Sequence, residues 1–246
     1  MKEILKLDHI QKYYGNSGNV TKAIQDISFS VQEGEFVGIM GASGSGKTTL
    51  LNCISTIDTV SAGHIYLDGT DVTEINEKQI ARFRRENLGF VFQDFYLLNS
   101  LSVKENIMLP MVLDKAPVDK CYKNVEAYAE NFGLSHLLEK QPYEVSGGEK
   151  QRVAICRALI NNPDLILADE PTGNLDSKSG KIVIDALKDI NEHMGKTIIM
   201  VTHDPQMASY CSRLILLKDG VILEDLKNSG NQDAFYQEIL GKMKEL

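Results

Sequence analysis

The sequence has no long apolar run, and this absence excludes a membrane-spanning helix. Its uncharged apolar stretches, such as residues 107–113, fall well short of the roughly 18 to 20 residues that crossing a bilayer requires. The opening residues, MKEILKLDHI, interrupt their apolar positions with charge, so we do not expect a signal peptide. Both absences favour a protein that works on the cytoplasmic side of the cell.

Cysteine is scarce, and the four cysteines are scattered at positions 53, 121, 156 and 211 with no CxxC pair. Zinc sites and disulfide frameworks need paired cysteines at characteristic spacings. We therefore expect reduced, partly buried thiols, as is usual in a cytosolic protein.

Basic residues are outnumbered: 26 Lys and Arg face 34 Asp and Glu, which gives a formal net charge of −8. General binding to a nucleic-acid backbone needs a basic footprint, so no nucleic-acid partner is expected. An acidic chain can still bind phosphate at one pocket where backbone N–H groups supply the positive field. The 43% hydrophobic fraction over 246 residues is sufficient for a sizeable core.

Apolar patterning predicts a parallel α/β core with two additions. Compact apolar runs predict buried strands at residues 35–40, 164–170 and 197–204. Alternating residues predict antiparallel strands at 4–10 and 24–31, separated by a loop at 15–20, and Asp-Gly pairs predict hairpins at 64–73 and 214–223. Helical spacing predicts an insertion over about 99–160 and helices near 181–193 and 233–244.

The strongest motif is GASGSGKT at residues 41–48, a full match to G-x-x-x-x-G-K-[ST] between a predicted strand and a predicted helix. Glycines let the chain wrap closely around phosphates, and successive N–H groups with the helix dipole attract the anion. Lys47 is expected to reach the β- and γ-phosphates and Thr48 to ligate Mg²⁺. The residues predicted to bind ATP here are Gly41, Ala42, Ser43, Gly44, Ser45, Gly46, Lys47, Thr48 and Thr49. The predicted fold is therefore an α/β P-loop NTPase, a RecA-like parallel sheet core with an antiparallel β subdomain and a helical insertion.

Two carboxylates end the predicted strand that begins near residue 164. Asp169 is placed to hold Mg²⁺ through water, as phosphoryl-transfer sites require. Glu170 points differently and is a candidate to polarise the attacking water. A P-loop alone leaves kinases, GTPases and many ATPases open, so the remaining motifs must distinguish among them.

A second glycine pair opens a predicted helix in SGGEKQR, residues 146–152. Alone, this segment is typical of a helix cap and turn. The ordered set GASGSGKTT, VSGGEKQR, LILADEPTGNLD and VTHD, however, resembles the nucleotide-binding domain of ABC transporters over essentially the whole chain. The resemblance implies one such domain over 1–246, with an ATPase core at 1–92 and 161–246 and a helical subdomain at about 93–160.

The resemblance assigns roles to further residues, each an expectation. The signature motif, Ser146, Gly147 and Gly148, would contact the γ-phosphate of ATP held by a partner copy, and Asp176 would lie at the dimer interface. His203 would contact the γ-phosphate, and Gln93 would help ligate Mg²⁺ and sense a membrane partner. Tyr14 would stack on adenine, with the neighbouring Tyr13 left open as the alternative. The signature departs from the commonest pattern at Val145 and at Glu149, whose charge is expected to weaken ATP-driven dimerisation modestly.

The residues of the motifs are similar to those of the macrolide-export and lipoprotein-release group, and within it to those of the bacitracin- and lantibiotic-resistance ATPases of Gram-positive bacteria. This implies ATP and Mg²⁺ as cofactors, a second copy and a separate membrane permease as partners, and a signalling link to a sensor histidine kinase through that permease. The chain would then sit on the inner face of the cell membrane. Macrolide efflux and lipoprotein release remain alternatives. A soluble ATPase acting on ribosomes or DNA is disfavoured, because one motif set and a short insertion are present.

Overall fold

The computed structural model describes residues 2–15 and 20–245. Its strands are β1 (Glu3–Tyr14), β2 (Thr21–Gln32), β3 (Phe36–Gly41), β4 (Ala62–Leu67), β5 (Thr70–Asp71), β6 (Leu88–Phe92), β7 (Leu165–Asp169), β8 (Thr197–Val201), β9 (Arg213–Lys218) and β10 (Val221–Lys227). Within the described residues these strands form one sheet in the order β5-β4-β1-β2-β10-β9-β3-β8-β7-β6.

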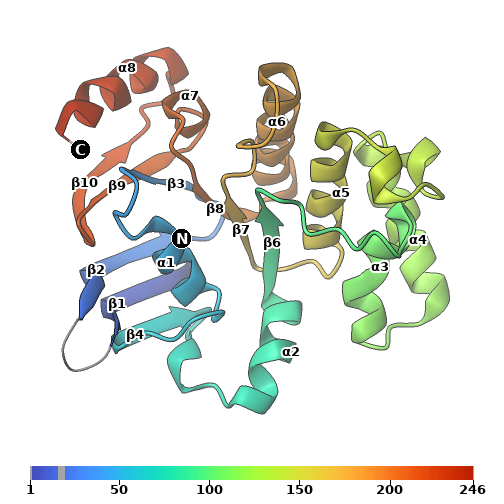
Figure 1. Cartoon of the computed structure of the whole chain (residues 1–246), viewed down its shortest axis with the longest axis horizontal. Coiled ribbons are helices and arrows are strands. Elements are labelled where there is room, and N and C mark those ends of the chain that lie inside the picture. Colours follow the sequence, from blue (N-terminus) through green and yellow to red (C-terminus); the bar gives the residue numbers. More distant parts are fainter. Residues whose placement is uncertain (1, 16–19, 246) are drawn as a thin grey trace.

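The α-helices are α1 (Lys47–Ile54), α2 (Glu77–Asn87), α3 (Val103–Leu113), α4 (Val118–Asn131), α5 (Gly147–Leu159), α6 (Ser177–Met194), α7 (Pro205–Ala208) and α8 (Gln232–Lys242). Short 3₁₀ turns occupy Val72–Glu74, Ser135–Leu137, Pro142–Glu144 and Met243–Glu245. Figure 1 shows α3, α4 and α5 grouped at one end of the molecule, away from β1, β2 and α8.

The parallel part of the sheet positions the candidate site. β8 lies between β3 and β7 and is parallel to both, and every residue of β3 and β8 is buried. Val201 at the end of β8 is opposite Ile39 on one side and Asp169 on the other. The carboxyl ends of the three strands therefore meet at one edge, where open parallel sheets collect ligands. The three predicted buried strands are confirmed.

The antiparallel part contains β1, β2, β4 and β5, as the alternating pattern predicts. Both predicted hairpins are confirmed: Asp68-Gly69 joins β4 to β5, and Asp219-Gly220 joins β9 to β10. All four turn residues have positive φ, between 45° and 77°, as tight hairpin turns demand. The predicted loop at 15–20 falls largely on residues 16–19, which lie outside the described residues.

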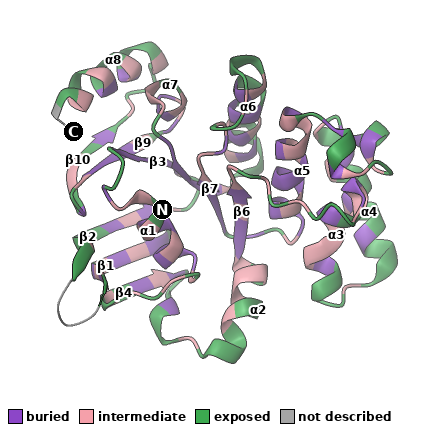
Figure 2. Ribbon diagram, viewed as in Figure 1, coloured by how far each residue is buried: buried purple, intermediate pink, exposed green. Residues whose placement is uncertain are grey.

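The helical insertion has a core of its own. Buried residues from α3, α4 and α5 pack together, among them Ile107, Val125 and Cys156, and Figure 2 shows buried segments on these helices. The prediction of helices within 99–160 is confirmed. Two neighbouring elements were not predicted: β6, which extends the parallel sheet beyond β7, and α2, which buries no residue and so carries no apolar stripe to recognise.

All four cysteines are free and buried, in agreement with the expectation of structural thiols. Across residues 2–15 and 20–245, no helix has both the length and the apolar character needed to cross a membrane.

Candidate active site

The loop between β3 and α1 forms one wall of a pocket of about 370 Å³. Gly44 and Gly46 have φ of 83° and 99°, a region that favours glycine. A Cβ on Gly46 would lie 2.5 Å from the carbonyl oxygen of Ala23 on β2. The backbone therefore requires glycine here, and Ala23, which no motif indicates, becomes a lining residue.

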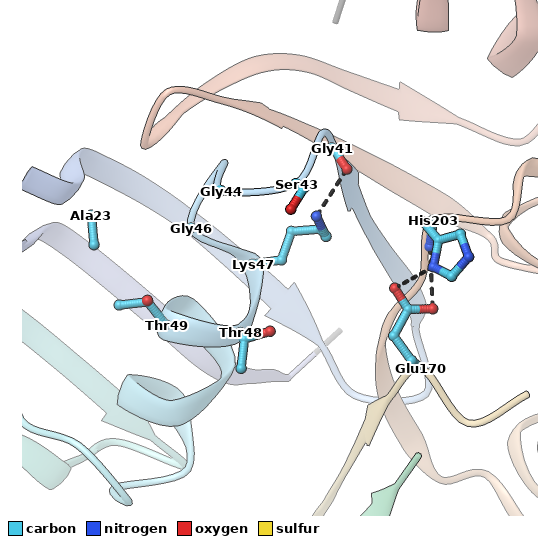
Figure 3. A pocket seen from close by; sticks show the side chains of 10 residues that line it. All are labelled: Ala23, Gly41, Ser43, Gly44, Gly46, Lys47, Thr48, Thr49, Glu170 and His203. Atoms are coloured by element: carbon cyan, nitrogen blue, oxygen red, sulfur yellow. Dashed lines mark hydrogen bonds and ion pairs between the residues drawn. The ribbon is translucent and has the colours of Figure 1, made fainter. Parts of the chain in front are cut away.

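Lys47 lies inside this pocket and extends along the loop (Figure 3). Its Nζ donates hydrogen bonds of 2.9 Å to the carbonyls of Gly41 and Ala42. Burial lowers the pKa of Lys47, while the nearby carboxylates of Glu170 and Asp169 oppose that shift. The Lys47 ammonium thus lies among backbone carbonyls and acidic groups. A phosphate bound in the pocket would place its negative charge next to this ammonium.

Glu170 and His203 stand on the opposite wall, at the ends of β7 and β8 (Figure 3). His203 Nδ1 is 2.8 Å from Glu170 Oε1, and the His203 backbone N–H donates to Glu170 Oε2 at 3.3 Å. The Glu170 side chain is 16% exposed and that of His203 71%. Glu170 has φ of 46°, a conformation uncommon outside glycine that often marks functional sites. A shielded carboxylate and an open imidazole therefore face the phosphate loop together.

The oxygen donors near Lys47 suit a hard cation. Thr48 lines the pocket, and Asp169 ends β7 beside Glu170. Burial is the main cause that raises the pKa of Asp169, the charge of Glu170 adds to it, and Lys47 opposes it. A divalent cation beside Asp169 would favour the ionised carboxylate, and Mg²⁺ prefers such oxygen ligands. The donor set therefore fits Mg²⁺.

Most of the predicted phosphate-binding residues line the pocket, but two do not. Gly41, Ser43, Gly44, Gly46, Lys47, Thr48 and Thr49 line it, together with Ala23, Glu170 and His203. Ala42 and Ser45 are absent from the lining. The side chain of Ser45 is buried and its backbone N–H donates to the Ala42 carbonyl at 3.2 Å. Ser45 therefore stabilises the conformation of the loop in this structure and does not line the pocket.

Gln93, expected at the metal, is held elsewhere by a residue that no motif singles out. Its Nε2 donates to Asn174 Oδ1 at 3.1 Å, while Asn174 Nδ2 donates to the Gln93 carbonyl at 3.2 Å and to Asp94 Oδ1 at 2.8 Å. A Cβ on Gly173 would lie 2.8 Å from Gln93 Nε2. Asn174 thus ties the segment after β6 to the segment after β7, and Gln93 does not line the pocket.

The signature segment is also outside the pocket, at the start of α5. Ser146 caps this helix because its hydroxyl accepts from the Glu149 backbone N–H at 3.4 Å, and its hydroxyl and backbone N–H both donate to Glu149 Oε2 at 2.7 Å. These two hydrogen bonds lower the pKa of Glu149. Gly147 and Gly148 pack against Leu175 and Ser179, which lie 3.2 Å from where their Cβ atoms would be. Close packing, besides any ligand, therefore disfavours larger residues at both positions.

Asp176 caps α6 and is exposed. Its carboxylate accepts from the backbone N–H groups of Lys178 and Ser179, both at 3.0 Å, and from the Ser179 hydroxyl at 2.7 Å. The Ser179 hydrogen bonds lower the pKa of Asp176. The predicted interface residue therefore has a local structural role in the single chain.

Tyr14, at the end of β1, is 42% exposed. It lies near the pocket because it is next to Thr49, which lines the pocket. The Thr49 side chain reaches the Tyr14 hydroxyl, which itself donates to Asp58 Oδ2 at 2.6 Å. Tyr13 instead donates to Gln11 on its own strand. Of the two tyrosines left open by the sequence, Tyr14 is the one that contacts a pocket-lining residue.

Comparison with known proteins identifies the same assembly of motifs. A family model described as ABC transporter matches residues 24–173. The ABC transporter ATP-binding protein YxdL of Bacillus subtilis is 48% identical over 247 residues, covering 100% of this chain and 95% of that protein. The bacitracin export ATP-binding protein BceA of Halalkalibacterium halodurans is 46% identical over 238 residues, covering 96% of this chain and 94% of its own length.

A solved structure shares the fold. It is the dimeric post-hydrolysis state of the ATP-binding cassette MJ0796 bound to ADP and Pi, from a protein of Methanocaldococcus jannaschii. The two chains are 38% identical with a TM-score of 0.84, and the match covers 93% of this chain and 100% of that one. The predicted P-loop NTPase fold, with its antiparallel part and helices, is confirmed.

Proposed function

We infer the function from one premise: the chain belongs to the ABC transporter family and is an ATPase of that family. We propose that it supplies ATP hydrolysis to a separate membrane permease and that the complex protects against antimicrobial peptides. The observation that carries the catalytic part is the pocket in which Lys47 and Thr48 face the Glu170–His203 pair. We propose that it binds the triphosphate of ATP.

The residues of this pocket divide the chemistry among them. Lys47 neutralises phosphate charge, and the N–H groups of the glycine loop hold the phosphate oxygens. Glu170 orients the attacking water and accepts its proton, and His203 holds the Glu170 carboxylate by the 2.8 Å contact and lies ready to donate to the γ-phosphate. Thr48 and Asp169 would hold Mg²⁺, with Gln93 once it leaves Asn174. Mg²⁺ held by these residues would supply positive charge that offsets the charge developing on the phosphate.

We propose that two copies are needed to complete each ATP site. Ser146, Gly147 and Gly148 do not line the pocket of their own chain, and an N–H-rich helix start is suited to a phosphate. A head-to-tail pair would bring the signature segment of each copy to the nucleotide of the other, with Asp176 at the interface. The dimeric state of the MJ0796 cassette supports this arrangement.

The permease would dock beside the segment that follows Gln93. Tyr96 and Leu98 are 62% and 47% exposed, and the Arg157 guanidinium donates to the carbonyls of Phe95 and Tyr96. Next to them a groove of about 500 Å³ runs between α2 and α3. We propose that residues 1–92 and 161–246 form the ATPase core and residues 93–160 the subdomain that moves with the permease.

The similarity to BceA supports a peptide of the bacitracin or lantibiotic class as the signal or cargo, and a sensor histidine kinase as a third partner reached through the permease. The chain would then lie on the inner face of the cell membrane. Macrolide efflux or lipoprotein release is the alternative within the same group, and the nucleotide pocket is the same for all three.

Co-expression with a permease whose gene adjoins the gene of this chain tests this proposal. We expect the two chains to co-purify in detergent, the complex to hydrolyse ATP, and bacitracin or a lantibiotic to change that rate. A macrolide or a lipoprotein changing the rate instead would overturn the peptide assignment. Co-purification with ribosomes and no permease would overturn the transport function.

A further inference from the structure

An ion pair between a buried lysine and a partly exposed aspartate lies behind Tyr14. Lys12 is 7% exposed, and its Nζ is 2.5 Å from Asp58 Oδ1 and 2.6 Å from the carbonyl oxygen of Thr59. Asp58 Oδ1 also accepts from the Thr59 backbone N–H at 2.7 Å. A buried lysine is rare unless it is paired, so this pair fixes the turn after α1 against the end of β1.

The same pair holds the Tyr14 ring at two places. Asp58 Oδ2 accepts from the Tyr14 hydroxyl at 2.6 Å, and Lys12 Nζ lies 4.9 Å from the ring centroid, within the range of a cation–π contact. The hydroxyl edge and one face are thus engaged, while 42% of the residue stays exposed. A charged acceptor and a buried cation together restrict the ring to one orientation.

Tyr13 offers a natural contrast. Its hydroxyl donates to Gln11, and Lys22 Nζ lies 5.5 Å from its ring centroid. Neighbouring residues of a strand point to opposite faces, so the Tyr13 side chain shares none of these contacts, although the Tyr13 backbone N–H donates to Ser61 Oγ in the segment after α1 at 3.0 Å.

We propose that Lys12 and Asp58 are positioning residues that hold the Tyr14 ring in place as the platform for the adenine base. The proposal rests on the ATP site proposed above, with Tyr14 beside Thr49. A ring already fixed before binding loses little conformational freedom when the base stacks on it, and such preorganisation strengthens binding. The Lys12–Asp58 pair would therefore raise affinity for the base portion of the nucleotide and leave the phosphate contacts unaffected.

Binding of ATP and of tripolyphosphate, which has no base, to the full chain by calorimetry tests this proposal. Tyr14→Phe keeps the ring and removes only the hydroxyl, and Tyr13→Phe is the matched control. We expect Tyr14→Phe to weaken ATP binding by roughly 3- to 10-fold and to leave tripolyphosphate binding unchanged. Tyr13→Phe should change neither. Tyr14→Ala should weaken ATP binding by roughly 5- to 150-fold, as loss of base stacking does.

Asp58→Asn, alone and combined with Tyr14→Ala, tests the positioning role of the Lys12–Asp58 pair by changing Asp58 itself. Asp58→Asn should weaken ATP binding in the wild-type background and have no further effect once the ring is absent. Equal effects of Asp58→Asn in both backgrounds, or normal ATP binding by Tyr14→Phe, would overturn the positioning role while leaving Tyr14 as the platform. Normal ATP binding by Tyr14→Ala would remove the platform itself, although hydrolysis by that variant would leave the ATPase proposal standing.

Discussion

The phosphate loop and the signature segment are both glycine-rich helix starts, but they differ in what occupies their N–H groups. α1 begins after Gly46, whose missing side chain provides no cap. α5 begins after Ser146, which forms a complete capping box with Glu149. The first helix start is left open toward the Glu170–His203 pair, whereas the second already holds a carboxylate of its own.

This difference shows that a helix N-terminus becomes a site only through what surrounds it. The open end of α1 faces Glu170 and His203, which two neighbouring strands bring to the pocket, so one chain supplies both of these walls. The capped end of α5 meets Leu175 and Ser179 of the same chain and no pocket-lining residue. We infer that α5 contributes to catalysis only when a second copy presents a nucleotide to it.

The largest effect is expected at the open site. Glu170→Gln keeps the shape of the side chain but removes its capacity to accept a proton, so hydrolysis should fall by about 10²- to 10⁴-fold. ATP binding should persist, and the ATP-bound dimer should accumulate. Turnover assays and size-exclusion chromatography with ATP measure both. Undiminished hydrolysis would refute the role assigned to Glu170.

Mixing two inactive variants tests whether the signature segment at the start of α5 completes the ATP site of the partner copy. Ser146→Arg lies in the signature segment, and Glu170→Gln in the pocket. In a head-to-tail pair the mixed dimer has one site with both lesions and one intact site, so an equal mixture should recover about a quarter of wild-type hydrolysis. Activity no higher than the variants show separately would mean that each chain works alone, and the comparison above would fail.

An intermediate effect is expected at the link between the segments that follow β6 and β7. Asn174→Ala removes the hydrogen bonds to Gln93 and Asp94, which frees Gln93 but leaves the segments after β6 and β7 no longer tied to each other in a defined position. We expect the turnover number to fall about 10-fold, as small misplacements of catalytic groups do, with ATP binding nearly unchanged. Asn191→Ala is a matched control, because the Asn191 amide likewise donates two hydrogen bonds, here to the carbonyls of Gly34 and Lys196, away from the pocket. An equal loss of turnover in both variants would indicate general destabilisation.

A smaller effect is expected at the capping box. Glu149→Gln keeps the box geometry but removes a negative charge that competes with phosphate for the Ser146 hydroxyl. In the Glu170→Gln background, ATP-driven dimerisation should tighten by roughly 2- to 5-fold, the range of one exposed charge at a helix start. Analytical ultracentrifugation at several ATP concentrations measures the change, and weaker dimerisation would contradict the competition.

The same substitution has a consequence for pH dependence. The folded-state pKa of Glu149 is lowered from 4.5 by the Ser146 hydrogen bonds, so its stabilising contribution is present above that value and lost as the pH falls through the folded-state pKa. The stability advantage of the wild type over Glu149→Gln should therefore shrink in acid. Urea unfolding of both proteins between neutral and acidic pH measures this difference.

Local signals in the sequence predicted the parts of the molecule that local chemistry fixes. The phosphate loop, the carboxylates after β7 and the Asp-Gly hairpins all depend on residues within a few positions of one another. What the sequence did not reveal depends on long-range contacts: Asn174 meets Gln93 across 81 positions, and Asp58 meets Tyr14 across 44. Single asparagines and aspartates are too common in loops to signal such pairs. Which of Tyr13 and Tyr14 lies beside Thr49 likewise depends on the fold.

The location of the cysteines has a practical consequence. Cys53, Cys121, Cys156 and Cys211 are all buried, and burial raises the pKa of the Cys53 thiol to about 12, so reagents that attack thiolates find little to react with. One reporter thiol added at an exposed position such as Glu126 on α4 could therefore carry a fluorescent dye while the native four stay unlabelled. Energy transfer between dyes on two copies would then follow, in real time, how the two molecules approach and separate as ATP is hydrolysed.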